Sequence, residues 1–221
     1  TTVSVGTLQV GSASALGAGA VSIGGAGVLD LIYSGTIALP STLNMASGAA
    51  ITNSANTSSL SVAGASTLSG SINTAGSQTY TGAVTLGANA SLTTLNTSSV
   101  NTNGNISFSS TVDSTAGSYY GLSVTNGSGA TTFGAAVGAY SGTSALGYLC
   151  INAVGCSATL IGTSTGNGTT SLAGNVTTSG TQTYGGDLAI VGLNAALTST
   201  ANSGNGVVTV AGSVSAVSSG T

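Results

Sequence analysis

The chain has 221 residues, 41% of them hydrophobic, with no lysine, arginine or histidine and only three acidic residues, Asp30, Asp113 and Asp187. This composition excludes most ion-pair and proton-transfer chemistry, and it lacks the basic residues that supply most of the affinity for nucleic acids and anionic membrane surfaces. Disordered chains are usually charged, rich in proline and poor in aliphatic residues, whereas this one has a single proline. We therefore expect an ordered chain that binds no nucleic acid and inserts into no membrane.

Short groups of alternating aliphatic and small polar residues recur along the chain. Examples in chain order are VSVGTLQV at 3–10, GAVSI at 19–23, GAVTL at 82–86, NISF at 105–108 and GNVTT at 174–178. Gly, Asn or Ser bounds each group, as is typical of strands separated by turns. Glycine and β-branched residues interrupt every stretch with a helical period. The sequence therefore predicts an all-β fold with very little helix.

The amino-terminal residues and the hydropathy indicate the type of segment. No run approaches the roughly 20 apolar residues that a membrane-spanning helix needs. The chain begins with Thr1-Thr2-Val3 in place of a methionine and a basic leader, so we expect a mature or excised segment.

The two cysteines, Cys150 and Cys156, lie in the sequence CINAVGC. Their spacing allows a small disulfide-closed loop, which is favoured in a protein that lives where thiols oxidise. The alternative is that both are small buried hydrophobic residues. The change in mass on alkylation distinguishes the two.

An internal repeat relates residues 68–95 to residues 172–199, an offset of 104 residues (172 − 68). The matches pair Gln78 with Gln182, Tyr80 with Tyr184, Leu86 with Ile190, and Leu92 with Ala196, next to Leu197. Repeats built from several short strands are typical of solenoids, in which each turn stacks on the one before.

The fold that we predict is one continuous parallel β-helix (β-solenoid) over residues 1–221. With roughly 20 residues per turn the chain makes about eleven turns. A rise of about 4.8 Å per turn gives an elongated body roughly 50 Å long. Val, Leu and Ile stack inside it, and Asn, Ser and Thr form ladders at the corners.

Two segments resemble known secreted β-helical proteins. GTLQVGSASALGAGAVSIGGAGVLDL, from Gly6 to Leu31, resembles the passenger-associated repeats of autotransporters. The stretch from Gly104, GNISFSSTVDSTAGSYYGLSVTNGSGATTFGAAVG, followed by TTSLAGNVTTSGTQTYGG, resembles repeats of filamentous-haemagglutinin-like exoproteins. These resemblances imply a bacterial adhesin-type β-solenoid that is extracellular or on the cell surface, and they carry over no binding residue.

The chemistry of the side chains argues against an enzyme. A serine or cysteine nucleophile needs a general base, and no histidine or lysine is present. The aspartates are separated by 83 (113 − 30) and 74 (187 − 113) residues, which places them some 15–20 Å apart along a coil. Paired hydrolytic carboxylates lie within about 10 Å. We predict no catalytic residue, no cofactor and no metal site.

Tyrosines are the candidate contact residues. Tyr119 and Tyr120, in the loop from Ser114, and Tyr140 and Tyr148, in the loop that ends at Cys156, could stack on sugars or form lateral contacts. Because adjacent strand residues point to opposite faces, we expect one of Tyr119 and Tyr120 to be exposed even if the other is buried. Ordinary packing is the alternative role.

Asn-x-Ser/Thr triplets, at Asn56, Asn89, Asn105 and Asn175 among others, make glycosylation a further hypothesis. Ser and Thr are so common in this chain that several such triplets are expected by chance.

Three functions fit the sequence. The first is a non-catalytic extracellular fibre or stalk segment that self-associates end to end, because open solenoid ends expose unpaired strands. The second is an adhesin module that binds a surface or host receptor through loops. The third and weaker one is a pilus subunit assembled by donor-strand exchange.

Overall fold

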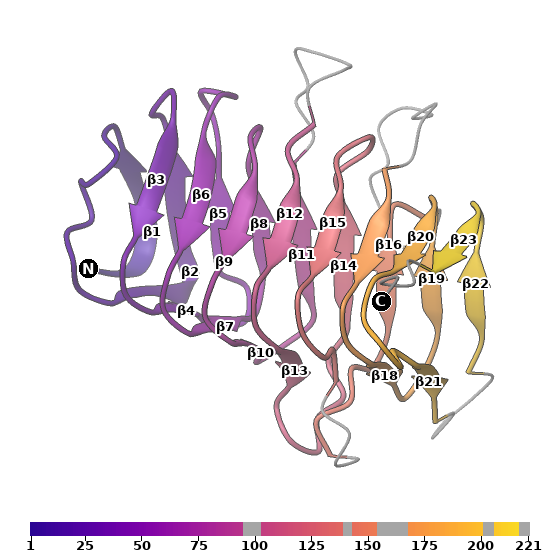
Figure 1. The fold of residues 1–221 in the computed structure, drawn as a ribbon. Coiled ribbons are helices and arrows are strands. Elements are labelled where there is room, and N and C mark those ends of the chain that lie inside the picture. The colour runs from indigo at the N-terminus through magenta and orange to yellow at the C-terminus, as the bar shows by residue number, and fades with distance from the viewer. Residues whose placement is uncertain (95–102, 139–142, 154–167, 201–205, 217–221) are drawn as a thin grey trace.

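The computed structural model describes residues 1–94, 103–138, 143–153, 168–200 and 206–216. These residues form 23 β-strands and no helix, and every pairing between strands is parallel. Figure 1 shows the strands stacked turn upon turn along one axis, with the N-terminus at one end and β22 and β23 at the other. The prediction of an all-β parallel β-helix is confirmed.

The strands of each turn lie on three faces. The first face contains the amino-terminal part of β2 (Val21–Leu31), β4 (Leu43–Met45), β7 (Ser66–Leu68), β10 (Val84–Leu86) and β13 (Val112–Ser114). Isolated bridges through Val137 connect it to β18 (Val176–Thr178), which pairs with β21 (Leu197–Ser199).

The second face begins with the carboxyl-terminal part of β2. It continues through β5 (Ala50–Thr52), β8 (Ser71–Asn73), β11 (Ala90–Thr93), β14 (Leu122–Thr125), β16 (Leu149–Ile151), β19 (Gln182–Tyr184) and β22 (Val208–Val210). The long strand β1 (Thr2–Val10) pairs along β2 and so covers both of these faces at the amino-terminal end.

The third face is an eight-stranded sheet. It contains β3 (Thr36–Leu39), β6 (Ser59–Val62), β9 (Gln78–Tyr80), β12 (Ile106–Phe108), β15 (Thr131–Phe133), β17 (Thr170–Leu172), β20 (Leu188–Ile190) and β23 (Val214–Ala216).

Alternation within each short strand produces the core. In a three-residue strand such as β10, the outer residues point inward and are buried, whereas the middle residue points outward. The parallel register places inward residues of successive turns over one another, in rows that we call columns. On the second face one column runs Leu8, Leu29, Ile51, Ile72, Leu92, Val124, Ile151, Tyr184, Val210. The core is therefore continuous along the axis.

An aromatic stack forms part of a column on the third face. The rings of Tyr80 and Phe108 have centroids 5.2 Å apart, and those of Phe108 and Phe133 are 5.0 Å apart, with interplanar angles of 12° and 6°. These distances are close to the spacing of neighbouring strands, about 4.8 Å, so the register itself stacks the rings. All three side chains are buried.

The number of residues per turn varies. On the third face, partners in successive turns lie at residues 37, 60, 78, 106, 131, 170, 188 and 214. A turn thus takes from 18 residues (60 to 78) to 39 residues (131 to 170). The total of about eleven turns stays a prediction.

The 104-residue repeat recurs on a different face. Gln78 and Tyr80 lie in β9 on the third face, whereas their counterparts Gln182 and Tyr184 lie in β19 on the second. The repeat is therefore not a whole number of turns. What recurs is a run of four strands with the corners between them, β8 to β11 in the first copy and β18 to β21 in the second.

Candidate functional site

Tyr119 and Tyr120 lie in the loop between β13 and β14, and both are half-buried. Tyr120 packs against the core, and its backbone N–H donates to Oγ of Ser114 at 2.7 Å. Tyr119 has φ of +52°, in the left-handed region that bulky residues rarely adopt. The expectation that one of the pair is exposed is wrong, because the alternation of strands does not apply in this loop.

Tyr148 lies next to this loop, one turn further along the coil. The N–H of Leu122 donates to the carbonyl of Tyr148 at 3.0 Å, and the N–H of Gly147 donates to the carbonyl of Tyr120 at 2.8 Å. The ring of Tyr148 lies over Gly121, where a Cβ atom would collide with it. We call Tyr119, Tyr120 and Tyr148 the tyrosine cluster. Tyr140 lies outside the described residues.

The predicted loop from Tyr140 to Cys156 contains a strand, because residues 149–151 form β16. Cys150 is the middle residue of β16, and its partners are Ser123 of β14 and Thr183 of β19. Cys156 lies outside the described residues, so the disulfide stays a prediction.

Asp30, at the end of β2, has a buried carboxylate with four hydrogen-bond donors. Oδ1 accepts from the backbone N–H of Ser54 at 2.9 Å and from Oγ1 of Thr52 at 3.0 Å. Oδ2 accepts from Oγ of Ser54 at 2.6 Å and from Nε2 of Gln9 at 3.2 Å. Burial raises the pKa of this carboxyl, but the four hydrogen bonds outweigh it and hold the pKa below its usual value. Asp30 thus links three successive turns.

The three aspartates lie on different faces. Asp30 is on the second face, Asp113 is the middle residue of β13 on the first, and Asp187 directly precedes β20 on the third. The geometry therefore brings no two of these carboxylates together in the way that paired hydrolytic acids require.

Residues that directly precede a strand form side-chain bonds to the next turn, a role that the sequence analysis missed. Oδ1 of Asn89, Asn105 and Asn175 accepts from the N–H of Gly121, Ala130 and Ala196 respectively, at 2.8–2.9 Å. Asp187 accepts in the same way from the N–H of Ser213 at 2.8 Å, and this bond lowers the pKa of its carboxyl. Each donor also directly precedes a strand, so we call this set the strand-start acceptors.

The Asn-x-Ser/Thr triplets were the signal for these acceptors. In the triplet at Asn105, the asparagine bonds to the next turn, Ile106 enters the core and Ser107 points outward. Asn89 shows the same order, with Ala90 buried and Ser91 half-buried. Asn175 also bonds to the next turn and Val176 enters the core, but Thr177 is itself buried. In these three triplets the asparagine therefore has a structural role in the coil.

A buried glutamine network occurs twice, at residues that the sequence pattern marks only as members of a repeat. Oε1 of Gln78 accepts from the hydroxyl of Tyr80 at 3.0 Å, and Nε2 donates to the carbonyl of Thr93 at 2.9 Å and to Oγ1 of Thr74 at 3.2 Å. The pKa of the Tyr80 phenol is raised by burial, so it remains a neutral donor.

The second copy of the network repeats these bonds one face away. Gln182 accepts from Tyr184 at 3.1 Å and donates to the carbonyl of Thr198 at 2.9 Å and to Thr178 at 3.4 Å. Thr93 and Thr198 follow Leu92 and Leu197, so the structural counterpart of Leu92 is Leu197. The sequence match of Leu92 with Ala196 is one residue out of register.

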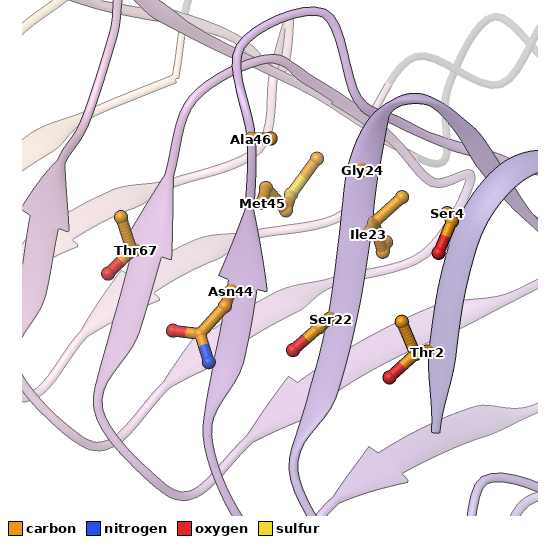
Figure 2. Close-up of a pocket in the computed structure, with 9 residues that line it drawn as sticks. All are labelled: Thr2, Ser4, Ser22, Ile23, Gly24, Asn44, Met45, Ala46 and Thr67. Atoms are coloured by element: carbon orange, nitrogen blue, oxygen red, sulfur yellow. The ribbon is translucent and has the colours of Figure 1, made fainter.

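A shallow hollow of about 390 Å³ lies on the first face near the amino-terminal end. Figure 2 shows its floor across β1, β2 and β4, with outward side chains of Thr2, Ser22 and Asn44 and with Thr67 at one side. Its lining has no charged and no aromatic side chain. Hydroxyl and amide groups of this kind form hydrogen bonds, but they supply no acid, base or metal ligand set.

The two ends of the coil expose apolar side chains. We call the end with β1 the head and the end with β21, β22 and β23 the tail. At the head, Leu8 is 37% exposed although it belongs to a core column. At the tail, Val208 is 38% and Val214 is 62% exposed, and both continue core columns. Large exposed aliphatic groups of this kind mark candidate interaction surfaces.

Within the described ranges, no helix is long and apolar enough to cross a membrane, and no three His, Cys, Asp or Glu side chains gather as a metal site would require.

In comparisons with known proteins, the chain matches no family model, no curated protein and no solved structure. The resemblance to autotransporter passengers and filamentous-haemagglutinin-like exoproteins stays a prediction. The fold and the local chemistry therefore carry the functional argument.

Proposed function

We propose that this chain is a non-catalytic, extracellular structural segment that forms part of a fibre or stalk. The observation that carries this proposal is the column structure: Leu29, Ile72, Val124 and Tyr184 belong to one uninterrupted column along the axis. A core of this kind has no interior site for a substrate. Each added turn lengthens the body by about 4.8 Å without changing its cross-section.

The polar groups support the same function. Three sets of polar side chains form hydrogen bonds to neighbouring strands or turns: the buried glutamines, Asp30 and the strand-start acceptors. These hydrogen bonds stabilise the coil. The chain contains no histidine or lysine that could act as a general base for its many hydroxyl groups. Its aspartates are on different faces.

The extracellular location rests on composition and on the resemblance. Backbone ladders and apolar burial replace ion pairs in this coil, so its stability depends little on ionic strength. The absence of Lys and Arg leaves no cleavage site for trypsin-like proteases. Both properties suit a rod outside the cell.

Electron microscopy and small-angle scattering of the purified chain test the proposal. We expect rods of uniform width whose length and melting temperature are unchanged between low and high salt. Leu92→Asp places a charge inside a column and is expected to abolish the rods, whereas Ser91→Asp, on the outward side of the same strand, is expected to preserve them. Compact spherical particles from the wild-type chain would contradict the proposal.

A second candidate function is receptor binding through the tyrosine cluster. The observation that favours it is the left-handed conformation of Tyr119, since backbone strain of this kind is concentrated at functional sites. Tyr119→Gly removes both the strain and the ring and is expected to abolish adhesion of the chain to its target surface if this function holds. Tyr33→Gly, at another corner, is the control. Unchanged adhesion with Tyr119→Gly would contradict the receptor-binding function, and the structural function would be the remaining candidate.

A further inference from the structure

The Asn-x-Ser/Thr triplets differ in what the coil does with their two polar groups. An N-linked glycan needs an accessible amide nitrogen on the asparagine, and the transferase that attaches it also reads the hydroxyl two residues further on. Five triplets lie in the described part of the chain, and they begin at Asn56, Asn89, Asn105, Asn126 and Asn175. Two more, at Asn96 and Asn167, begin outside the described residues. Burial and hydrogen bonding divide the five into two groups.

In the triplet at Asn126 the coil blocks the amide. The side chain is fully buried, and Nδ2 donates to the carbonyl of Ala130 at 3.0 Å. Oδ1 accepts from Nδ2 of Asn152, in the next turn, at 2.8 Å. Both ends of the amide are therefore in use, and a sugar on Nδ2 would have to enter the space between two turns.

In two other triplets the coil blocks the hydroxyl. Ser58, in the triplet at Asn56, is fully buried, and its hydroxyl donates to the carbonyl of Tyr33 at 2.5 Å. Thr177, in the triplet at Asn175, is 7% exposed within β18. A transferase cannot read a hydroxyl that the folded coil covers, so these triplets are closed as well.

The triplets at Asn89 and Asn105 are open. Both asparagines are exposed, and Ser91 and Ser107 lie on the outward side of β11 and β12. The residue between each asparagine and its serine is buried in the core. Because residues two apart in an extended chain point to the same side, the amide and the hydroxyl of each open triplet lie together on the outer surface.

The structural bond of these two asparagines uses only the carbonyl oxygen. Oδ1 of Asn89 accepts from the N–H of Gly121 at 2.8 Å, and Oδ1 of Asn105 accepts from the N–H of Ala130 at 2.9 Å. No described residue accepts a hydrogen bond from Nδ2 of either asparagine. N-glycosylation replaces a hydrogen on Nδ2 and keeps the carbonyl. The modified side chain therefore retains its bond to the next turn.

We propose that Asn89 and Asn105 are sites of N-linked glycosylation on the folded coil, and that the other three described triplets are not. In the reaction Nδ2 attacks C1 of a nucleoside-diphosphate sugar. The Nδ2–C1 bond forms, the bond from C1 to the diphosphate oxygen breaks, the nucleoside diphosphate leaves with that electron pair, and the Nδ2 proton passes to a base of the transferase. This modification adds to the proposed structural function and does not depend on it.

The same two sites are selected whether the sugar arrives before or after folding. A glycan attached early at Asn126 would have to occupy the buried corner that Asn152 fills, so such a chain could not complete the stack. Glycans at Asn89 and Asn105 would stand at the starts of β11 and β12, on the second and third faces.

Incubation of the folded 221-residue chain with UDP-glucose and a soluble N-glycosyltransferase that accepts Asn-x-Ser/Thr tests the proposal. Five short peptides that carry the same triplets without the fold are the reference substrates. Mass spectrometry after digestion with a broad-specificity protease locates the glucose. Relative to its peptide, we expect each open site of the folded chain to react at least about 10-fold faster than each closed site, because a covered group reacts only through local opening.

Two variants separate recognition of the triplet from general exposure. Ser107→Ala removes the hydroxyl and keeps Asn105 with its bond to Ala130, so it is expected to abolish the modification at Asn105 and leave that at Asn89 unchanged. Ser109→Ala changes an exposed serine outside the triplet and is expected to react as wild type. Far-UV circular dichroism verifies that both variants are folded.

The stability of the modified chain tests the retained bond. We expect the urea midpoint of the chain glycosylated at Asn89 and Asn105 to be no lower than that of the unmodified chain. A midpoint lowered as far as by Asn105→Ala would overturn the claim that Oδ1 keeps its partner. Equal modification of all five triplets in the folded chain, or none at Asn89 and Asn105, would overturn the assignment of the two sites. Neither result bears on whether the chain forms rods.

Discussion

Replacement of Gln78 by leucine tests whether the buried glutamine network stabilises the corners. The substitution keeps the approximate volume of the side chain and removes the bonds to Tyr80 at 3.0 Å and to the carbonyl of Thr93 at 2.9 Å. An unpaired buried polar group costs about 1–3 kcal/mol. The substitution leaves two buried groups without a partner, the hydroxyl of Tyr80 and the carbonyl of Thr93, and burial of the leucine side chain offsets part of this cost. We therefore expect Gln78→Leu to lower the free energy of unfolding by about 2–4 kcal/mol.

Tyr80→Phe keeps the ring that stacks on Phe108 and removes only the hydroxyl, so Oε1 of Gln78 loses its donor. We expect this change to cost about 1–2 kcal/mol. The double variant removes both partners, and it should be no less stable than Gln78→Leu alone. Urea unfolding followed by circular dichroism and tyrosine fluorescence measures all three.

Two results would refute this account of the network. One is additivity of the single substitutions within about 0.5 kcal/mol, which would mean that the two side chains do not interact. The other is a change of opposite sign for Gln182→Leu, because the bonds of Gln182 match those of Gln78 partner for partner.

Three other predictions follow from the packing and the carboxylates. Phe108→Ala removes the middle ring of the aromatic stack and is expected to cost about 3–5 kcal/mol in thermal unfolding, whereas Ser107→Ala, on the outward side of β12, changes stability by no more than about 0.5 kcal/mol. The pKa of Asp30 is lower in the folded chain than in the unfolded one, so its contribution is present above the unfolded value and is lost as the pH falls through the folded value. The melting temperature of the wild type should therefore fall below about pH 4, with a smaller fall in Asp30→Asn, and equal slopes for both would contradict this. Asn105→Ala removes the acceptor for the N–H of Ala130 and is expected to cost about 0.5–1.5 kcal/mol, seen as a lower urea midpoint, and an unchanged midpoint would count against the strand-start acceptors.

The fold could be predicted because the strand signal and the repeat signal agree. Groups such as NISF at 105–108 have two inward positions around one outward position, and the structure places β12 there. The glutamine and tyrosine markers also indicated a repeat. The face on which a repeat falls could not be predicted, because it depends on the lengths of the intervening loops, and these vary from turn to turn.

The local chemistry was harder to predict than the coil. Tyr119 and Tyr120 look like neighbours in a strand, and only tertiary contacts with the following turn place them in a half-buried loop. Asp30 has no acidic or basic neighbour in sequence, and its donors come from residues 9, 52 and 54, which only the stacking of turns brings together. The strand-start asparagines carried a visible signal in the triplets, but its cause appears only when the turns are superposed.

The displaced repeat has a consequence for how such a chain lengthens. The run of four strands from β8 to β11, with its corners, contains both partners of the glutamine, tyrosine and threonine bonds, and so does the run from β18 to β21. This unit therefore satisfies these polar groups by itself on both of the faces where its glutamine occurs. A duplicated stretch of gene need not encode a whole number of turns to be accommodated. Variation in length can therefore accumulate in small modules without loss of the fold, and the same modules offer a means to design rods of chosen length.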